Sequence, residues 1–298
     1  MTPMTEVQRP TAAVPLDTAP EPPAGLAALG AELRAARMVW RRELLHFVRD
    51  PTSAAVSLLQ PMLFLFVLGI GLARLFAGSG GGGRPAVDYL VFLFPGVLVM
   101  AAQAPAISVG ASIVWDRQSG FLREMLVAPV RRGTVLTGKC LGGATVATAT
   151  GTMVLASAGL VHVPYRGDLF ALLLAELLLT ALAMTVLGAV IAVTIRRMRT
   201  FNTVLSVLMT PMLFLSGLMF PVSAMPGWMA ALTLANPLTY AVDAMRRTTD
   251  ARLGSGSTLS EPVSWGGWHP PLPFELGLVA AFTAAALALA SRRFARAT

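Results

Sequence analysis

The chain has 298 residues, of which 55% are hydrophobic and 13% charged, and its mean hydropathy is +0.68. An average soluble domain carries about 25% charged residues, so we expect an all-α integral membrane protein. One cysteine excludes an internal disulfide framework, and three separated histidines offer no metal-ligand spacing. The net charge of +8 is distributed over alternate loops, and we therefore expect no nucleic-acid partner.

The N-terminal residues 1–30 are rich in Pro, Ala and Thr and contain no apolar core after a basic region. We expect a disordered cytosolic tail there, followed by a single transmembrane domain over 31–298. Residues 31–50 place apolar side chains at helical spacing between arginines, which predicts an amphipathic helix at the cytosolic interface. A plain basic segment beside the first span is the alternative.

Six apolar runs are long enough to cross a bilayer. They cover residues 54–76, 89–114, 138–160, 169–195, 202–220 and 272–291. With six spans, 17 of the 23 Lys and Arg residues fall on the side of the two termini. Because basic residues favour the cytosolic side, we expect both termini in the cytosol of a multi-pass protein.

The stretch GTVLTGKC, residues 133–140, matches a nucleotide-binding P-loop except at Cys140, where Ser or Thr would reach Mg²⁺. It precedes a membrane-length apolar run instead of following a buried strand, so we expect a helix start and no cofactor in this chain. Gly138 and Gly142 form GxxxG, and Gly143, Ala147 and Gly151 repeat the small-residue pattern. Both patterns permit close helix packing without proving a dimer.

The loop over residues 115–139 contains a short predicted helix with one apolar stripe, formed by Phe121, Leu122, Met125 and Leu126. Gly120 precedes this helix, Pro129 ends it, and Arg123 and Glu124 lie on its other side. Such a helix binds either a protein groove or the lipid surface, and the pattern alone leaves both open.

The predicted external segment, residues 221–271, is too apolar for a solvated loop and too interrupted by prolines for one span. Two short re-entrant helices in the outer leaflet satisfy both constraints. The alternative is a longer fifth span followed by a surface helix.

Three motifs suggest a family: DRQSGFLREMLVAP at 116–129, FLSGLMFP at 214–221 and ANPLTY at 235–240. In these motifs and in its span pattern the chain is similar, over about residues 35–295, to permease subunits of the ABC transporter type-2 family, especially the daunorubicin-type drug-export branch. Family members often carry Glu where this chain has Gln118, a departure that puts a charge-mediated contact there in doubt.

The resemblance implies that 116–129 is the coupling helix, which docks on a separate ABC ATPase that binds ATP and Mg. Its ATPase-coupling residues would be Asp116, Arg117, Gly120, Phe121, Leu122, Arg123, Glu124, Met125 and Leu126. The re-entrant segment would be marked by Pro221, Asn236, Pro237 and Tyr240. Further partners would be membrane lipids and a second permease copy, in a homodimer or with a related permease.

The resemblance implies export of a hydrophobic or amphiphilic substrate, such as a drug, antibiotic or lipid-like molecule, across the bacterial plasma membrane. Glu176 is the acidic residue well inside a predicted span, so it should face protein or water. We expect it to line the substrate path with Gln103 nearby, or else to be a structural carboxyl. The alternative functions are a proton-coupled secondary transporter that uses Glu176, and export of a lipid or glycan.

Overall fold

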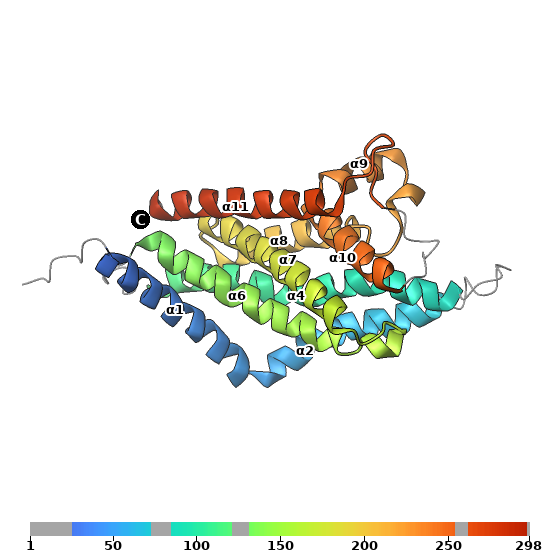
Figure 1. Ribbon diagram of the computed structural model, residues 1–298. Coiled ribbons are helices and arrows are strands. Elements are labelled where there is room, and N and C mark those ends of the chain that lie inside the picture. The colour runs from blue at the N-terminus through green and yellow to red at the C-terminus, as the bar shows by residue number, and fades with distance from the viewer. Residues whose placement is uncertain (1–25, 73–84, 121–130, 254–261, 297–298) are drawn as a thin grey trace, which may run out of the picture.

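The computed structural model describes residues 26–72, 85–120, 131–253 and 262–296, and these ranges are almost entirely helical (Figure 1). The elements are α1 (Leu26–Arg49), α2 (Pro51–Leu63), η1 (Phe64–Gly69), α4 (Pro85–Gln118), α6 (Arg132–Leu155), η2 (Ala158–Val161), α7 (Gly167–Thr194), α8 (Met198–Phe214), η3 (Val222–Ala224), α9 (Gly227–Ala235), α10 (Pro237–Leu253) and α11 (Leu272–Arg296). The all-α prediction is confirmed for the described part of the chain.

Four helices are long and apolar enough to cross a membrane: Pro51–Leu72, Tyr89–Gln118, Gly167–Thr194 and Leu272–Phe294. They correspond to the first, second, fourth and sixth predicted spans. The other two predicted spans correspond to α6, which is more polar along its length, and α8, which has 17 residues. An integral membrane protein is therefore supported, with four candidate spans among the described residues.

Two predicted spans begin and end at different residues in the structure. The third predicted span covers 138–160, but α6 runs from Arg132 to Leu155, and the remaining apolar residues form the short helix η2. The fifth predicted span covers 202–220, but α8 ends at Phe214. There the chain turns, with Gly217 at a φ of 74° that favours glycine, and reaches Pro221. Hydropathy alone does not detect such a turn, because its residues are apolar.

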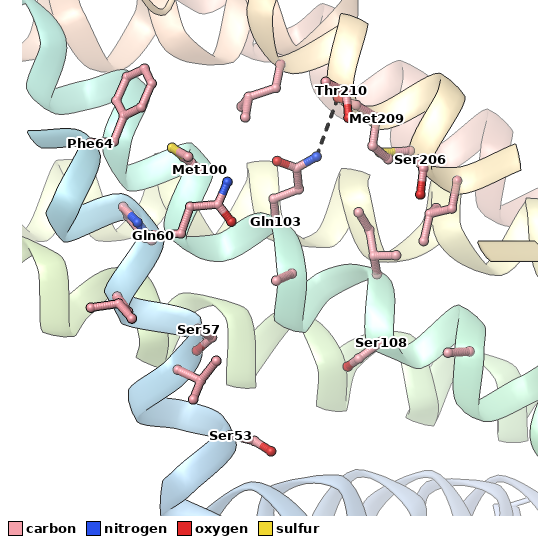
Figure 2. Close-up of a pocket in the computed structure, with 18 of the residues that line it drawn as sticks. Ser53, Ser57, Gln60, Phe64, Met100, Gln103, Ser108, Ser206, Met209 and Thr210 are labelled. Atoms are coloured by element: carbon pink, nitrogen blue, oxygen red, sulfur yellow. Dashed lines mark hydrogen bonds between the residues drawn. The ribbon is translucent and has the colours of Figure 1, made fainter. Parts of the chain in front are cut away.

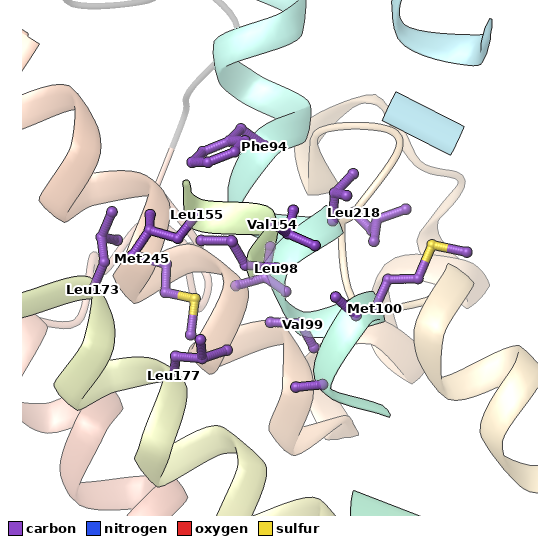
Figure 3. Packing of buried hydrophobic residues seen from close by; sticks show 14 of the residues in the cluster. Phe94, Leu98, Val99, Met100, Val154, Leu155, Leu173, Leu177, Leu218 and Met245 are labelled. Atoms are coloured by element: carbon purple, nitrogen blue, oxygen red, sulfur yellow. The ribbon is translucent and has the colours of Figure 1, made fainter. Parts of the chain in front are cut away.

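Helices α4 and α7 occupy the centre of the bundle. Both are apolar on all sides, as expected of helices that are covered all round. In the most apolar 18-residue stretch of each span, 78% of the residues are buried within the chain in α4 and 61% in α7, against 17% in the first span and 22% in α11. Figure 3 shows Leu98 of α4, Val154 of α6, Leu177 of α7 and Met245 of α10 converging in the core.

Small residues on α6 allow close packing within the chain. A Cβ on Gly138 would lie 2.9 Å from the Ala36 carbonyl oxygen of α1, and one on Gly142 would lie 2.8 Å from the Cβ of Glu43. A Cβ on Gly151 would lie 2.6 Å from Leu177 of α7. The predicted close helix packing is thus found between helices of one chain.

The ends of the helices sort into two groups (Figure 1). The start of α1, the end of α4, the start of α6, the end of α7 and the end of α11 lie at one end of the bundle. Helices α9 and α10 lie toward the other end, and α10 packs against α7, α11 and α4. The described arginine-rich loops are therefore brought together at the first end.

Candidate functional site

A groove of about 1160 Å³ runs between α2, α4 and α8 (Figure 2). Apolar side chains such as Val56, Ile107 and Leu205 form much of its wall. Neutral polar side chains are interspersed among them: Thr52, Ser53, Ser57, Gln60, Gln103, Ser108, Asn202, Ser206 and Thr210. Among the described residues that line the groove there is no Asp, Glu, Lys or Arg. The groove can therefore accept an apolar molecule and offer it neutral hydrogen-bond partners.

Gln103, which the sequence predicted on the substrate path, lines this groove. Its side chain extends from α4 toward α8, and its Nε2 donates to the Met209 carbonyl oxygen at 3.5 Å (Figure 2). The amide oxygen accepts no hydrogen bond from the described residues, so it is available to a molecule in the groove. This placement supports the predicted role without testing it.

Glu176, the second residue predicted on that path, lies elsewhere. Its side chain is buried between α7 and α10, where its Oε1 accepts a hydrogen bond from Thr248 Oγ1 at 2.6 Å. Glu176 is not among the residues that line the groove. The structure therefore does not bring Glu176 and Gln103 together in one cavity. The contact of Glu176 with α10 fits the alternative role of a structural carboxyl.

The predicted ATPase-coupling region is described as far as Gly120. Gly120 has a φ of 79° and follows the end of α4, as glycines beyond helix ends commonly do. Arg117 donates to the carbonyl oxygens of Ala192 and Val193, each at 3.5 Å, and so attaches α4 to the end of α7. Phe121, Leu122, Arg123, Glu124, Met125 and Leu126 lie outside the described residues.

Asp116, another predicted coupling residue, faces the interior. Its Oδ2 lies 2.5 Å from Lys139 Nζ of α6 and 3.6 Å from Arg42 Nη2 of α1. Lys139 is 2% exposed and also donates to Ser112 Oγ at 3.0 Å. The sequence analysis did not identify this pair. The available signal was that Lys139 is the chain's one lysine among 22 arginines.

The P-loop-like stretch 133–140 is helical throughout and belongs to α6. Its lysine, Lys139, is bound to Asp116, and Cys140 is 1% exposed in the core. A phosphate-binding loop needs backbone amides that point at the ligand, and in this helix they are directed along the helix axis. No group of three or more His, Cys, Asp or Glu within the described ranges could hold a metal ion.

The motifs 214–221 and 235–240 contact each other, since Thr239 Oγ1 donates to the Leu215 carbonyl oxygen at 3.3 Å. Asn236 Nδ2 donates to the Met212 carbonyl oxygen at 2.6 Å, and its Oδ1 accepts from Leu238 N at 3.1 Å. One side chain thus bonds a carbonyl near the end of α8 and an N–H at the start of α10, where Pro237 is the first helical residue. Tyr240 donates to the Leu234 carbonyl oxygen and accepts from Trp265.

The segment after Pro221 forms η3, α9 and α10, of which α10 is buried. A longer fifth span followed by a surface helix does not describe this arrangement. Whether α9 and α10 re-enter a membrane stays a prediction.

Four membrane-length apolar helices within the described residues, with a neutral groove between α2, α4 and α8, define the class: a multi-pass membrane protein. The model of the ABC-2 type transporter family matches residues 34–249, and the chain belongs to this family. The family predicted from the three motifs is therefore confirmed.

Curated relatives agree with this assignment. The chain is 28% identical to Nodulation protein J of Rhizobium meliloti over 212 residues, which are 70% of this chain and 78% of the relative. It is 24% identical to Inner membrane transport permease YadH of Escherichia coli over 213 residues, 71% of this chain and 81% of the relative. It is 26% identical to Putative transport permease ycf38 of Cyanophora paradoxa over 211 residues, 69% and 71% respectively. The chain is thus a transport permease of this family.

Proposed function

We propose that this permease is the membrane subunit of an ATP-driven exporter that moves a hydrophobic or amphiphilic substrate, such as a drug, antibiotic or lipid-like molecule, out of a bacterial cell. The neutral groove between α2, α4 and α8 carries this proposal. Its apolar wall suits the body of an amphiphile, and the Gln103 and Ser206 side chains offer hydrogen bonds without requiring a charged ligand.

A second permease copy, identical or related, faces the groove. Gln60 on α2 and Asn202, Ser206 and Thr210 on α8 are exposed on the two helix faces that flank the groove. Polar side chains in membrane helices usually face protein or water, because hydrocarbon cannot satisfy their hydrogen bonds. A second copy across these faces would enclose the substrate path between the two permeases.

Cysteine crosslinking tests this arrangement. A cysteine at Ser206 should crosslink two copies in native membranes. A cysteine at Leu178, exposed on α7 and away from the groove, is the matched control and should not crosslink. Crosslinking of Leu178→Cys without crosslinking of Ser206→Cys would show that the two permease copies contact each other through another face.

Six spans and two cytosolic termini complete the proposed topology. At 1.5 Å per residue the 24 residues of α6 extend about 36 Å and the 17 residues of α8 about 26 Å, against a hydrocarbon thickness of about 30 Å. Lipids and short terminal turns accommodate the small deficit of α8. The arginine-rich end of the bundle faces the cytosol.

ATP hydrolysis takes place in a partner ABC ATPase, the kind of subunit with which permeases of this family work. The segment that follows α4, as far as residue 129, docks on that subunit. Arg117 and Gln118 at the end of α4 bond carbonyl oxygens at and just beyond the end of α7, so a push on this segment would move α4 and α7 together. Such rigid-body movement would shift the walls of the groove.

The double variant Phe121→Ala/Leu122→Ala tests ATP coupling. Contacts of this kind commonly lose about 2 kcal/mol or more on truncation, so copurification with the ATPase and substrate-stimulated hydrolysis should both fall. The control Leu45→Ala/Val48→Ala removes exposed apolar side chains from α1 and should change neither. Wild-type behaviour of the 121/122 variant, with normal membrane insertion, would exclude this helix as the coupling element.

A proton-coupled secondary transporter remains the second candidate, favoured by one observation. The Oε2 atom of Glu176 is buried with no hydrogen-bond partner within the described structure. Transport into inverted vesicles separates the two functions. The ATP-driven exporter keeps transporting when ATP is supplied and the proton gradient is collapsed, whereas the secondary transporter stops.

A further inference from the structure

An ion cluster joins three helices at the arginine-rich end of the bundle. Lys139 of α6 lies between Asp116 of α4, at 2.5 Å, and Glu43 of α1, at 4.0 Å. Arg42 of α1 also reaches Asp116, at 3.6 Å, and Glu43, at 3.4 Å. With Lys139 2% exposed and Asp116 11% exposed, water screens these charges poorly. The cluster therefore fixes the end of α4 to α1 and α6.

Helix α1 also holds the start of α6. Glu32 Oε1 accepts a hydrogen bond from the backbone N–H of Arg131, at 3.0 Å. Hydrogen bonds from the Thr134 side chain and from this N–H lower the pKa of the Glu32 carboxyl, which therefore stays ionised. Arg131 has no capping hydrogen bond from its own side chain, so a residue of α1 supplies a cap for α6.

The contact between α1 and α6 leaves little room for sliding. Gly138 and Gly142 bring the two backbones together, with a Cβ on Gly138 placed 2.9 Å from the Ala36 carbonyl oxygen. Farther along the same contact, Trp40 Nε1 donates to Thr145 Oγ1 at 3.1 Å. Close packing and directional bonds together make α1 and α6 move as one body.

We propose that Arg42, Asp116 and Lys139 are positioning residues that transmit movement of the coupling segment to α1 and, through it, to the α2 wall of the groove. The proposal rests on the exporter function above. Glu32 and the ion cluster connect α1 to both ends of the segment between Asp116 and Arg131. Asp116 acts inside the permease, not on the ATPase surface.

The connection from α1 to the groove is short. Helix α2 begins at Pro51, two residues after α1 ends, and Asp50 caps it by accepting from Ser53 N at 3.0 Å. Ser53, Ser57 and Gln60 of α2 line the groove. A tilt of α1 therefore displaces a groove wall directly.

The contacts of α6 with α1 and α4 explain why the P-loop-like stretch contains Gly138 and Lys139. Gly138 permits the approach of α1, and Lys139 supplies a compact ammonium with three donors, which fits between two helices where a planar guanidinium demands more space. Apart from the lysine at 139, all Lys and Arg positions of the chain hold arginine. The lysine at 139 therefore matches the small enclosed site.

The test uses the double variant Asp116→Asn/Lys139→Gln, which removes both charges of the pair and keeps side chains able to bond each other. It is assembled with the wild-type ATPase in nanodiscs. Arg41→Gln, which removes an exposed charge from the neighbouring position on α1, is the control. Copurification, basal hydrolysis, the maximal substrate-stimulated hydrolysis and the substrate concentration for half-stimulation are measured together.

The expected result is a loss of about ten-fold in maximal stimulation, within the usual range of coupling between sites. Copurification and the half-stimulating concentration stay at wild-type values, and the control keeps full stimulation. Wild-type stimulation in the double variant would overturn the proposal, and so would failure of this variant to insert, since the pair would then serve folding. Failure of the wild-type permease to copurify with any ATPase would instead refute the exporter function.

Discussion

At the scale of single residues, the guanidinium of Arg246 is buried where α4, α10 and the turn after α8 meet. It donates to the carbonyl oxygens of Phe92, at 3.3 Å, and Gly217, at 2.9 Å. Its carbon Cζ also lies 3.8 Å from the centre of the Phe92 ring. Charged groups are buried only when such partners compensate their lost hydration. Arg246 therefore holds the 215–220 turn against α4.

Replacing Arg246 with methionine should destabilise the protein by about 2 kcal/mol or more, since two buried carbonyl groups lose donors at about 1–3 kcal/mol each. Thermal unfolding in detergent measures the change. Arg252→Gln is the control, because Arg252 pairs with Asp168 on the surface, where an ion pair contributes about 0–1 kcal/mol. Equal shifts for the two variants would contradict the assigned role of Arg246.

Two polar residues inside predicted spans should behave differently in transport. Gln103→Leu removes an amide from the groove, and we expect altered substrate selectivity at normal expression. Glu176→Gln keeps an oxygen that accepts from Thr248, and we expect selectivity close to wild type. Competition between transported substrates measures both. The opposite pattern would place the substrate path beside Glu176 and α10.

At the scale of elements, glycines on α6 determine how closely helices approach. Gly142→Leu would drive a side chain into Glu43 of α1, and Gly151→Leu would drive one into Leu177 of α7. Overpacking of this kind typically costs about 1–3 kcal/mol. Gly133→Ala adds a methyl where no atom lies within 4 Å, so it should be neutral or stabilise the helix by up to about 1 kcal/mol. The melting temperatures of Gly142→Leu and Gly151→Leu should fall below that of the wild type, and that of Gly133→Ala should not. A lowered melting temperature for Gly133→Ala would contradict this explanation.

Sequence reasoning predicts helices here because lipid leaves few other ways to satisfy the backbone. Sequence reasoning errs where tertiary contacts determine the ends of helices. At Phe214, for example, an apolar turn ends α8 before the predicted residue 220. The pair Asp116–Lys139 was missed because both residues lie near predicted span ends and meet only through the crossing of α4 and α6. Polarity within a span predicts, for both Gln103 and Glu176, that the side chain avoids lipid. It does not predict which of them lines the groove.

At the scale of the whole molecule, the two ends of the bundle differ in charge. Helix α1 carries Arg34, Arg37, Arg41 and Arg42, and Arg42 lies 3.6 Å from Asp116 near the end of α4. Further arginines lie at or beside the start of α6 and the ends of α7 and α11, which share that end of the bundle (Figure 1). The opposite end carries α9, with Trp228 and Leu232 exposed. This asymmetry sets the expected orientation, because the positive-inside rule depends on loop charge at each membrane face.

The orientation is tested by cysteine accessibility in intact cells. The native Cys140 is 1% exposed and enclosed by apolar neighbours, so its background labelling by an impermeant thiol reagent should be low. A cysteine at Ser223, exposed in η3, should react with reagent added outside. A cysteine at Ser257, outside the described residues, is expected to do the same. A cysteine at Arg199, exposed at the start of α8, should react only in inverted vesicles. Labelling of Arg199→Cys from outside, with Ser223→Cys protected, would place the arginine-rich end on the external face, out of reach of a cytosolic ATPase.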